Sequence, residues 1–263
     1  MTLQLSKAPI VELIAEMHWL PITSDGSNIA ADMFVMTGPA EEDFYEGFRR
    51  SLKEFGFDKV ERLQPPGFPI GIHTAIYKHT RLIDSPSGVV VQIGPGLLSI
   101  HALPPYKDWT SFRPTIEQAL MALITARPRK ARSQVFTRVL LRYINVFDAN
   151  LMGGLTMLQF IRDVLKIGVS LPEVLKSETQ DSESVTLTVS VQMRTKDQRD
   201  LTLSVGPKPN SGDENSVVLD TFVATCSHTA WNADSVVESL DSSHESINRL
   251  FFGLTSPILS LMQ

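Results

Sequence analysis

The sequence VVVQIGPG at residues 89–96 resembles LTLSVGPK at residues 201–208, and each segment reads as a strand that ends in a Gly-Pro turn. The elements around the two segments also come in the same order. Hydrophobic periodicity predicts a strand, a helix, three strands and a helix over residues 9–126, and the same series over residues 135–254. This pattern indicates an internal duplication.

The spacing of apolar residues, with Gly and Pro at the ends of the segments, locates the individual elements. The predicted strands are 9–20, 70–83, 89–93, 97–103, 135–147, 185–194, 201–205 and 217–226, and the predicted helices are 41–55, 109–126, 155–166 and 236–254. Residues 185–194 alternate most regularly, with Val, Leu and Met on one side and Thr, Ser, Gln and Arg on the other. Trp109 and Trp231 precede the two closing helices, which is a further likeness between the halves.

The expected fold is α+β. Each β-α-β-β-β-α unit has a sheet with one apolar face and two helices to cover it, and joining two sheets edge to edge removes one exposed edge from each. We predict units at residues 1–132, including the basic linker RPRKAR at 127–132, and at residues 133–263, in one compact body. They would form a continuous, curved, mostly antiparallel sheet with helices on one face. This layout is similar to the saddle-like TATA-binding-protein fold in architecture alone.

Composition and charge restrict the classes of function. The chain has 29 acidic and 24 basic residues, a formal charge of −5, which argues against a protein that binds nucleic acid over its surface. A single cysteine, Cys226, excludes an internal disulfide and a cysteine-based zinc site. The first residues lack the uninterrupted apolar run of a secretory signal, and no stretch of about 18 apolar residues predicts a membrane span. We therefore expect a cytoplasmic protein without a membrane partner.

Three short motifs resemble a known family. They are Ala8-Pro9-Ile10-x-Glu12 in the first strand, Tyr106-x-x-Trp109 at the second helix and Arg142-Tyr143-x-Asn145 in the central strand. Together they resemble an uncharacterised, sporadically distributed bacterial family of about this length, and the resemblance spans nearly the whole chain. The family brings no established activity and no catalytic residues. Because sporadic distribution is typical of mobile loci, the resemblance implies a setting in phage defence or in toxin–antitoxin loci.

The polar side of the sheet is the first candidate binding surface. Strand alternation places Glu12, Glu16 and His18 on the polar face of the first strand. Arg138 and Arg142 share one face of the equivalent strand in the second half. If the two strands meet, carboxylates and guanidiniums can pair across the sheet. The pattern indicates a charged binding surface or an acid/base site, or alternatively an ion-pair network that joins the halves, which a half-buried sheet favours.

Three aromatic residues are the second candidate. Tyr106, Trp109 and Trp231 stand at helix starts and could form an exposed anchor for a partner, or pack against the end of the sheet, which is the commoner arrangement. Neither a metal site nor a cofactor is expected, because the six histidines lack the H-x-x-x-H and H-E-x-x-H spacings.

Two further groups of residues have side chains capable of acid/base or nucleophilic chemistry. His73, Tyr77 and His79 are expected on one face of a strand. Cys226 and His228 have the spacing of a strand face, but Cys226 continues an apolar alternation and is expected to be buried and inert.

Known catalytic signatures such as G-x-S-x-G, the P-loop and G-x-G-x-x-G are absent from the sequence, which favours a non-enzymatic function. We expect an interaction protein of a bacterial phage-defence or toxin–antitoxin locus. It would bind a partner protein, encoded at the same locus, through the face or the edge of its sheet. The alternative is an enzyme or small-ligand binder with a pocket on the polar sheet face. Unpaired outer strands would also allow a homodimer.

Overall fold

The computed structural model describes residue 5 and residues 7–21, 34–35, 38–81, 88–127, 134–178, 186–208 and 216–263. Its strands are β1 (Ile10–His18), β2 (Phe34–Val35), β3 (Lys59–Arg62), β4 (Ile70–Gly71), β5 (Tyr77–Thr80), β6 (Gly88–Gly94), β7 (Leu97–Leu103), β8 (Arg138–Phe147), β9 (Val189–Arg194), β10 (Arg199–Pro207) and β11 (Val217–Thr225). Its helices are α1 (Pro39–Lys53), α2 (Trp109–Ala126), α3 (Met157–Gln159) with the π-helix η2 (Phe160–Val164), α4 (Glu173–Glu178), α5 (Ala233–Thr255), the 3₁₀-helix η4 (Ser256–Ile258) and α6 (Leu259–Met262).

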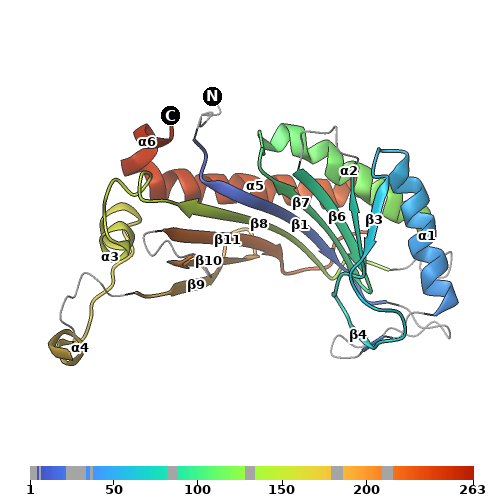
Figure 1. The fold of residues 1–263 in the computed structure, drawn as a ribbon, viewed down its shortest axis with the longest axis horizontal. Helices are drawn as coiled ribbons and strands as arrows, with labels where there is room; N and C mark the ends of the chain where they lie inside the picture. Colours follow the sequence, from blue (N-terminus) through green and yellow to red (C-terminus); the bar gives the residue numbers. More distant parts are fainter. Residues whose placement is uncertain are drawn as a thin grey trace.

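Within these residues, nine strands form one antiparallel sheet in the order β3-β5-β6-β7-β1-β8-β11-β10-β9 (Figure 1). The pair β1 and β8 lies in the middle. From β1 the strands β7, β6 and β5 follow outward, and from β8 the strands β11, β10 and β9 follow in the same manner. The similar segments at 89–96 and 201–208 fall on β6 and β10, which are equivalent positions. The predicted α+β fold with a continuous antiparallel sheet is confirmed, and the predicted boundary between residues 132 and 133 lies outside the described residues.

The central strand β1 is a strand because its apolar residues recur with a period of two. Leu13, Ala15 and Met17 are completely buried beneath the helices. Met17 is in register with Leu98 of β7 on one side and with Val139 of β8 on the other, so one row of side chains links both halves of the core. Complete burial of a side chain of this size stabilises the fold by about 1.5–3 kcal/mol.

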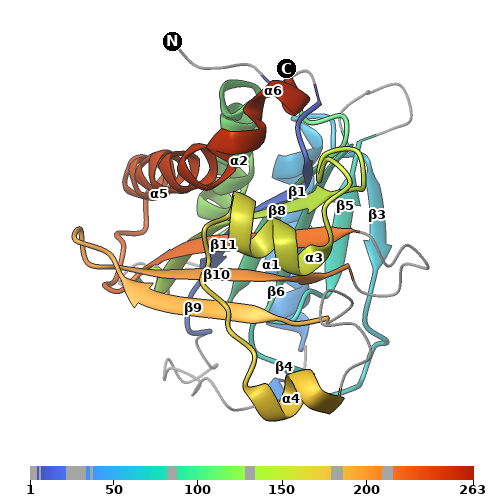
Figure 2. The same cartoon turned by 90° about the vertical axis from the view of Figure 1, so that its left-hand side faces the viewer.

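The long helices lie on one face of the sheet (Figures 1 and 2). Helix α5 packs across β8 and β11, α2 packs against β7, and α1 packs beside α2. Two polar residues begin these helices: Asp108 Oδ1 accepts a hydrogen bond from Ser111 N at 2.7 Å in α2, and Asn232 Oδ1 accepts one from Ser235 N at 2.8 Å in α5. The predictions of helices over 41–55, 109–126 and 236–254 are therefore confirmed.

The predicted strand over residues 70–83 is wrong in its middle. Residues 72–76 instead fold over the turn between β6 and β7, where His73 N donates to Pro95 O at 2.7 Å, and they return to the sheet at Ile76, whose N donates to Ile93 O of β6 at 2.9 Å. His73 has a φ of 64° in this turn. Because Gly94 has no Cβ, the backbone of Thr74 can lie directly against it. A period-two pattern cannot show a fold-back of this kind.

Other elements also differ from the prediction, and the short β2 and α4 are among those not expected. The helix predicted over 155–166 forms as the short α3 and the π-helix η2, in which Leu165 N donates to Phe160 O at 3.1 Å and Phe160 packs on Phe147. Strand β3 was not predicted, because Lys-Val-Glu-Arg contains a single apolar residue. Its strand geometry comes from pairing with β5, where Arg62 is opposite Tyr77.

Replacing Gly94 by alanine should destabilise the fold by about 2–3 kcal/mol, because the added methyl group would collide with the Thr74 carbonyl oxygen. Gly168→Ala is the matched control, since no atom lies within 4 Å of its added Cβ. Urea unfolding at neutral pH measures both free energies of unfolding. Equal stability of the two variants would contradict the close approach of residues 72–76 to the turn.

Candidate functional site

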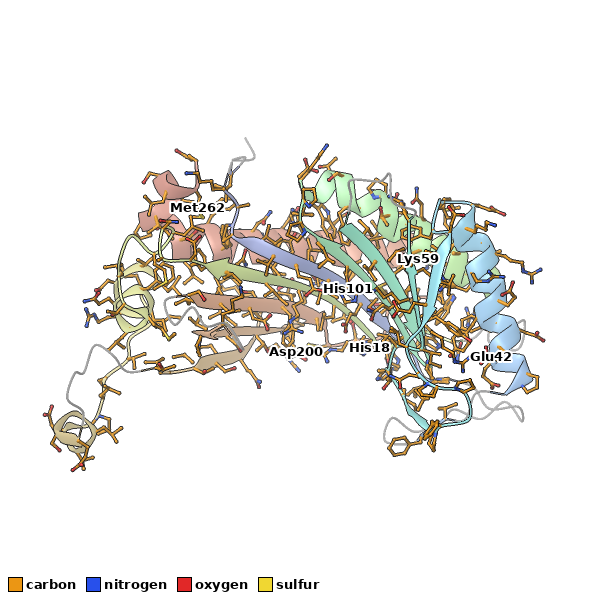
Figure 3. The ribbon with its side chains drawn as sticks, in the orientation of Figure 1. His18, Glu42, Lys59, His101, Asp200 and Met262 are labelled. Carbon is orange, nitrogen blue, oxygen red and sulfur yellow. The ribbon has the colours of Figure 1, made fainter. Side chains whose placement is uncertain are left out.

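The face of the sheet opposite the long helices carries the first group of predicted site residues. We call it the central polar face, and it comprises Glu12, Glu16 and His18 of β1, Ser99 and His101 of β7, Arg138 and Arg142 of β8, and Asp220 and Phe222 of β11. Figure 3 labels His18 and His101 on this part of the sheet. Side chains alternate between the two faces of a sheet. The intervening residues are buried under the helices, so these side chains point to the opposite face. The prediction that Glu12, Glu16, His18, Arg138 and Arg142 share one face therefore agrees with the geometry.

A linear hydrogen-bonded chain joins three of these residues. His101 Nδ1 lies 2.8 Å from Glu12 Oε1, and His101 Nε2 lies 3.1 Å from Ser99 Oγ. When Nδ1–H donates to the carboxylate, Nε2 is left to accept the serine proton. The order of acid, imidazole and hydroxyl is that of a nucleophilic serine site, but Ser99 is only 2% exposed. The sequence analysis did not predict this hydrogen-bonded series, although the Ser-x-His spacing on one strand face is visible in the sequence.

A second cluster lies at the end of β1. Glu16 Oε2 is 3.1 Å from His18 Nε2, and the His18 ring stacks on that of His73 with centroids 4.3 Å apart. Burial acts to raise the pKa of Glu16, but the hydrogen bond and charge of His18 together with more distant cations lower that pKa overall. Burial, with the nearby His18, lowers the pKa of His73. The predicted grouping of His73 with Tyr77 is wrong, because the turn places His73 beside His18.

The guanidinium of Arg142 pairs with Asp220 rather than with a glutamate of β1. Arg142 Nε and Nη2 donate to the two carboxylate oxygens of Asp220 at 2.8 and 2.6 Å. This bidentate bond raises the pKa of Arg142, against the effect of burial, and the charges of Glu16 and Glu12 contribute at longer range. Arg138 lies over the ring of Phe222, 5.8 Å from its centroid. The sequence indicated the face but not these partners on β11.

Tyr106 and Trp109 lie on the other side of the sheet, against the helices, where both rings contact Phe112 of α2. Trp109 Nε1 donates to Asp241 Oδ1 at 2.7 Å, and its indole stacks on the His244 ring at 4.7 Å. The Tyr143 hydroxyl lies 2.6 Å from Nδ1 of the same histidine. These contacts join α2 to α5 and β8, so the two aromatic residues do not share a surface with the central polar face.

Cys226 contradicts its sequence interpretation. Strand β11 ends at Thr225, and both Cys226 and His228 follow it as exposed residues. The alternation that predicted a buried cysteine stops one residue earlier, because pairing with β10 ends at Thr225.

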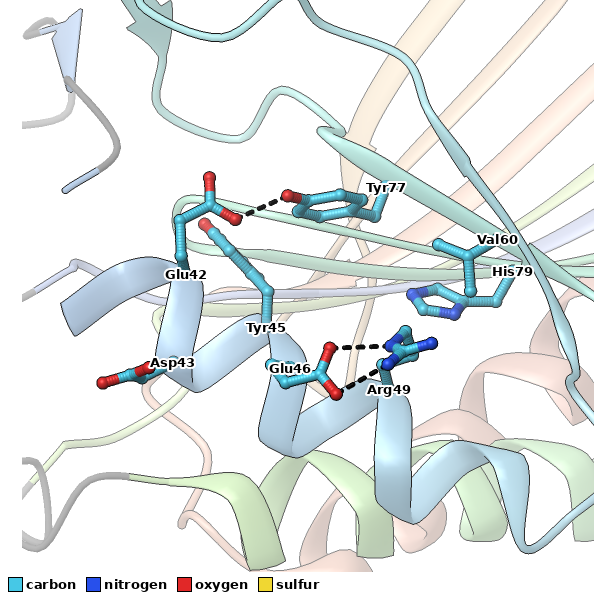
Figure 4. A pocket seen from close by; sticks show the side chains of 8 residues that line it. All are labelled: Glu42, Asp43, Tyr45, Glu46, Arg49, Val60, Tyr77 and His79. Atoms are coloured by element: carbon cyan, nitrogen blue, oxygen red, sulfur yellow. Dashed lines mark hydrogen bonds and ion pairs between the residues drawn. The ribbon is translucent and has the colours of Figure 1, made fainter. Parts of the chain in front are cut away.

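A pocket lies on the helix-covered side, between α1 and strands β3 and β5 (Figure 4). Its volume is about 410 Å³, and it is lined by Glu42, Asp43, Tyr45, Glu46, Arg49, Val60, Tyr77 and His79. His79 is 1% exposed, and neither ring nitrogen has a hydrogen-bond partner in the described structure. The Tyr77 hydroxyl donates to Glu42 Oε2 at 2.6 Å. This pocket is thus on the opposite side from the central polar face.

Comparison of the chain with models of known protein families and with curated proteins gives no match. In the described ranges, none of the helices combines the length and the apolar character that a membrane crossing requires. The same part of the chain contains no group of three or more His, Cys, Asp or Glu side chains placed to share a metal ion.

The Arg142–Asp220 pair should show a coupling energy of about 1 kcal/mol in a double-mutant cycle with Arg142→Met and Asp220→Asn. The bidentate geometry favours the pair, whereas partial exposure and salt weaken it. Urea unfolding of the four proteins at low and high salt measures the coupling. Additive effects at low salt would mean that the pair adds nothing to stability.

Stability should fall as the pH drops from 6.5 towards 4, because burial lowers the pKa of His79 to about 4 in the folded protein. The unfolded chain then binds a proton that the folded protein does not, and the complete effect of one such group is about 3 kcal/mol. His79→Leu should remove that part of the pH dependence, and His228→Gln, at an exposed histidine, should not. Unfolding free energies at pH 7 and pH 4.5 decide the matter, and an unchanged slope in His79→Leu would contradict the burial of a neutral imidazole.

Proposed function

We propose that this chain is a non-enzymatic interaction protein that binds a partner protein on the central polar face. The observation that supports the proposal is the one-sided cover of the sheet. Helices α1, α2 and α5 lie on one face, and no described helix packs over β1, β7, β8 and β11 on the other, where residues 72–76 contact the His18 end of β1. A wide sheet face of this kind is a rigid platform on which a partner can form many contacts at once.

The chemistry of the face supports a protein as the partner rather than a nucleic acid. Ile14 and Leu140 are buried between the charged groups, and the partly exposed ring of Phe222 supplies apolar contact surface beside them. The carboxylates of Glu12, Glu16 and Asp220 outnumber the two guanidiniums there, so the face does not attract phosphates. A mixture of apolar contacts and paired charges is typical of protein interfaces.

The biological setting of the proposal comes from the motif resemblance. We place the protein in the cytoplasm as a component of a bacterial phage-defence or toxin–antitoxin locus, with its partner encoded by an adjacent gene. The lone Cys226 is compatible with a reducing compartment. The proposed locus thus depends on the motif resemblance, and the proposed binding surface depends on the sheet face that carries no helix.

Co-expression with the products of adjacent genes, followed by affinity purification and calorimetry, tests the proposal. Arg138→Glu should weaken binding at least about tenfold, or about 1.4 kcal/mol, because it reverses a charge on the face without breaking an ion pair. Arg50→Glu, an exposed position on α1, is the control and should bind as the wild type does. Failure to co-purify any of these products, or equal binding by both variants, would count against the central polar face.

The hydrogen-bonded chain of Ser99, His101 and Glu12 favours a second candidate, an acyl-transfer enzyme. Its weakness is the burial of Ser99, whose hydroxyl a substrate must reach. A fluorophosphonate probe would phosphonylate an activated serine, forming an Oγ–P bond as the P–F bond breaks and fluoride leaves, with a mass increase that Ser99→Ala abolishes. An unmodified mass after prolonged exposure would eliminate this candidate and leave the binding function.

A further inference from the structure

The two outer strands of the sheet differ in how they are protected. Strand β3 is four residues long and carries the exposed charges of Lys59 and Glu61, which are unfavourable for pairing with another strand. Strand β9 is six residues long, Val-Ser-Val-Gln-Met-Arg, and its single charge is Arg194 at the end. An edge of that length without interior charges is able to accept another strand.

The helix side of β9 is also apolar and incompletely covered. Val189 and Val191 are half-buried, and Met193 is 51% exposed. Strand β5, at the equivalent position in the first half, lies under α1, whose Phe48 packs on His79. In the second half α3 and η2 pack at the end of β8 instead, so β9 receives no such cover (Figure 2).

The hairpin between β9 and β10 shows which backbone groups of β9 face outward. Thr195 N donates to Arg199 O at 2.8 Å, so Thr195 points its amide towards β10. Backbone amide and carbonyl groups alternate in direction along a strand. Residues 189, 191 and 193 therefore also point these groups towards β10. The amide and carbonyl groups of Ser190 and Gln192 then point away from the sheet, where no described strand pairs with them.

We propose that β9 pairs with β9 of a second copy of this chain, antiparallel about a two-fold axis through Val191. This register sets Val191 opposite Val191 of the second copy and Val189 opposite Met193 of the second copy. Ser190 and Gln192 exchange the outward hydrogen bonds across the axis. The two sheets become one continuous sheet with nine described strands from each copy, and the long helices of both copies lie on the same face.

Other registers of the β9 pair bury less apolar side-chain surface between the two copies. Side chains that are directly opposite must lie on the same face, so the axis passes through a residue rather than between two. An axis at Gln192 leaves Val189 opposite Thr195, and an axis at Ser190 pairs only residues 189–191 within the strand. The axis at Val191 covers all three apolar side chains of each copy and sets no two charges of equal sign opposite each other. The interface does not involve the central polar face. The dimer and the binding of a partner protein can therefore be tested independently.

Sedimentation and light scattering of the full chain at micromolar concentrations test the association. Wild-type protein should have the mass of a dimer, and Val191→Lys should weaken the dimer at least tenfold. Glu61→Lys, on the opposite edge, is the matched control and should remain dimeric. A wild-type monomer throughout the range, or a Val191→Lys dimer of unchanged affinity, would overturn the proposal.

A second variant separates loss of the dimer from misfolding of Val191→Lys. Gln192→Pro removes an outward amide and leaves the hydrogen bonds to β10 in place, which an edge strand tolerates. It should also be monomeric, with the circular dichroism of the wild type. A well-folded Gln192→Pro dimer would overturn the proposed hydrogen bonding.

Cysteine cross-linking tests the register. Cys226 is exposed, so the experiment uses a Cys226→Ser background. Residue 191 would form a pair without hydrogen bonds across the axis, the kind of pair in which opposite side chains are closest, so Val191→Cys should give a disulfide-linked dimer under mild oxidation. Gln192→Cys should not, because it would face Ser190 of the second copy. The reverse result would overturn the register.

Discussion

The antiparallel ladder between β1 and β8 is the interaction on which the rest of the structure depends. It pairs the edge strand of each half with the other and leaves one continuous sheet in place of two. The row of side chains through Met17, with Leu98 and Val139 on either side, carries the core across the joint. Because register determines which side chain faces the helices, the same ladder also determines the composition of the opposite face.

The central polar face is a consequence of this joint. The β1–β8 pairing sets Ile14 opposite Arg142, and the next strands bring His101 and Asp220 to either side. Most of the polar groups there have a partner, as in the hydrogen bond between Glu12 and His101 and the ion pair between Arg142 and Asp220, while Arg138 lies over the Phe222 ring. Partly exposed pairs of this type add little stability, so their arrangement bears more on which partner the face accepts.

The helices cover the two halves of the sheet unequally. In the first half α1 lies beside α2 and shields β5, with Phe48 packed on the buried His79. In the second half the equivalent chain segment becomes α3 and η2 and packs Phe160 on Phe147. The sheet therefore has one shielded edge and one edge whose apolar side chains remain in contact with solvent.

The sequence by itself determined the order of the main strands and helices, without the short β2, β3 and α4. It also determined the strand β7 and the helix α2 to the residue, and the common face of Glu12, Glu16, His18, Arg138 and Arg142. These features depend on local periodicity, which side-chain alternation and helical spacing express directly. Only the tertiary structure decided that His73 leaves the strand, that β3 joins the edge, that Cys226 is exposed, and that Ser99, His101 and Asp220 partner the predicted residues. Each of these depends on contacts between residues distant in the chain, because register across strands and the close approach at Gly94 have no local signal.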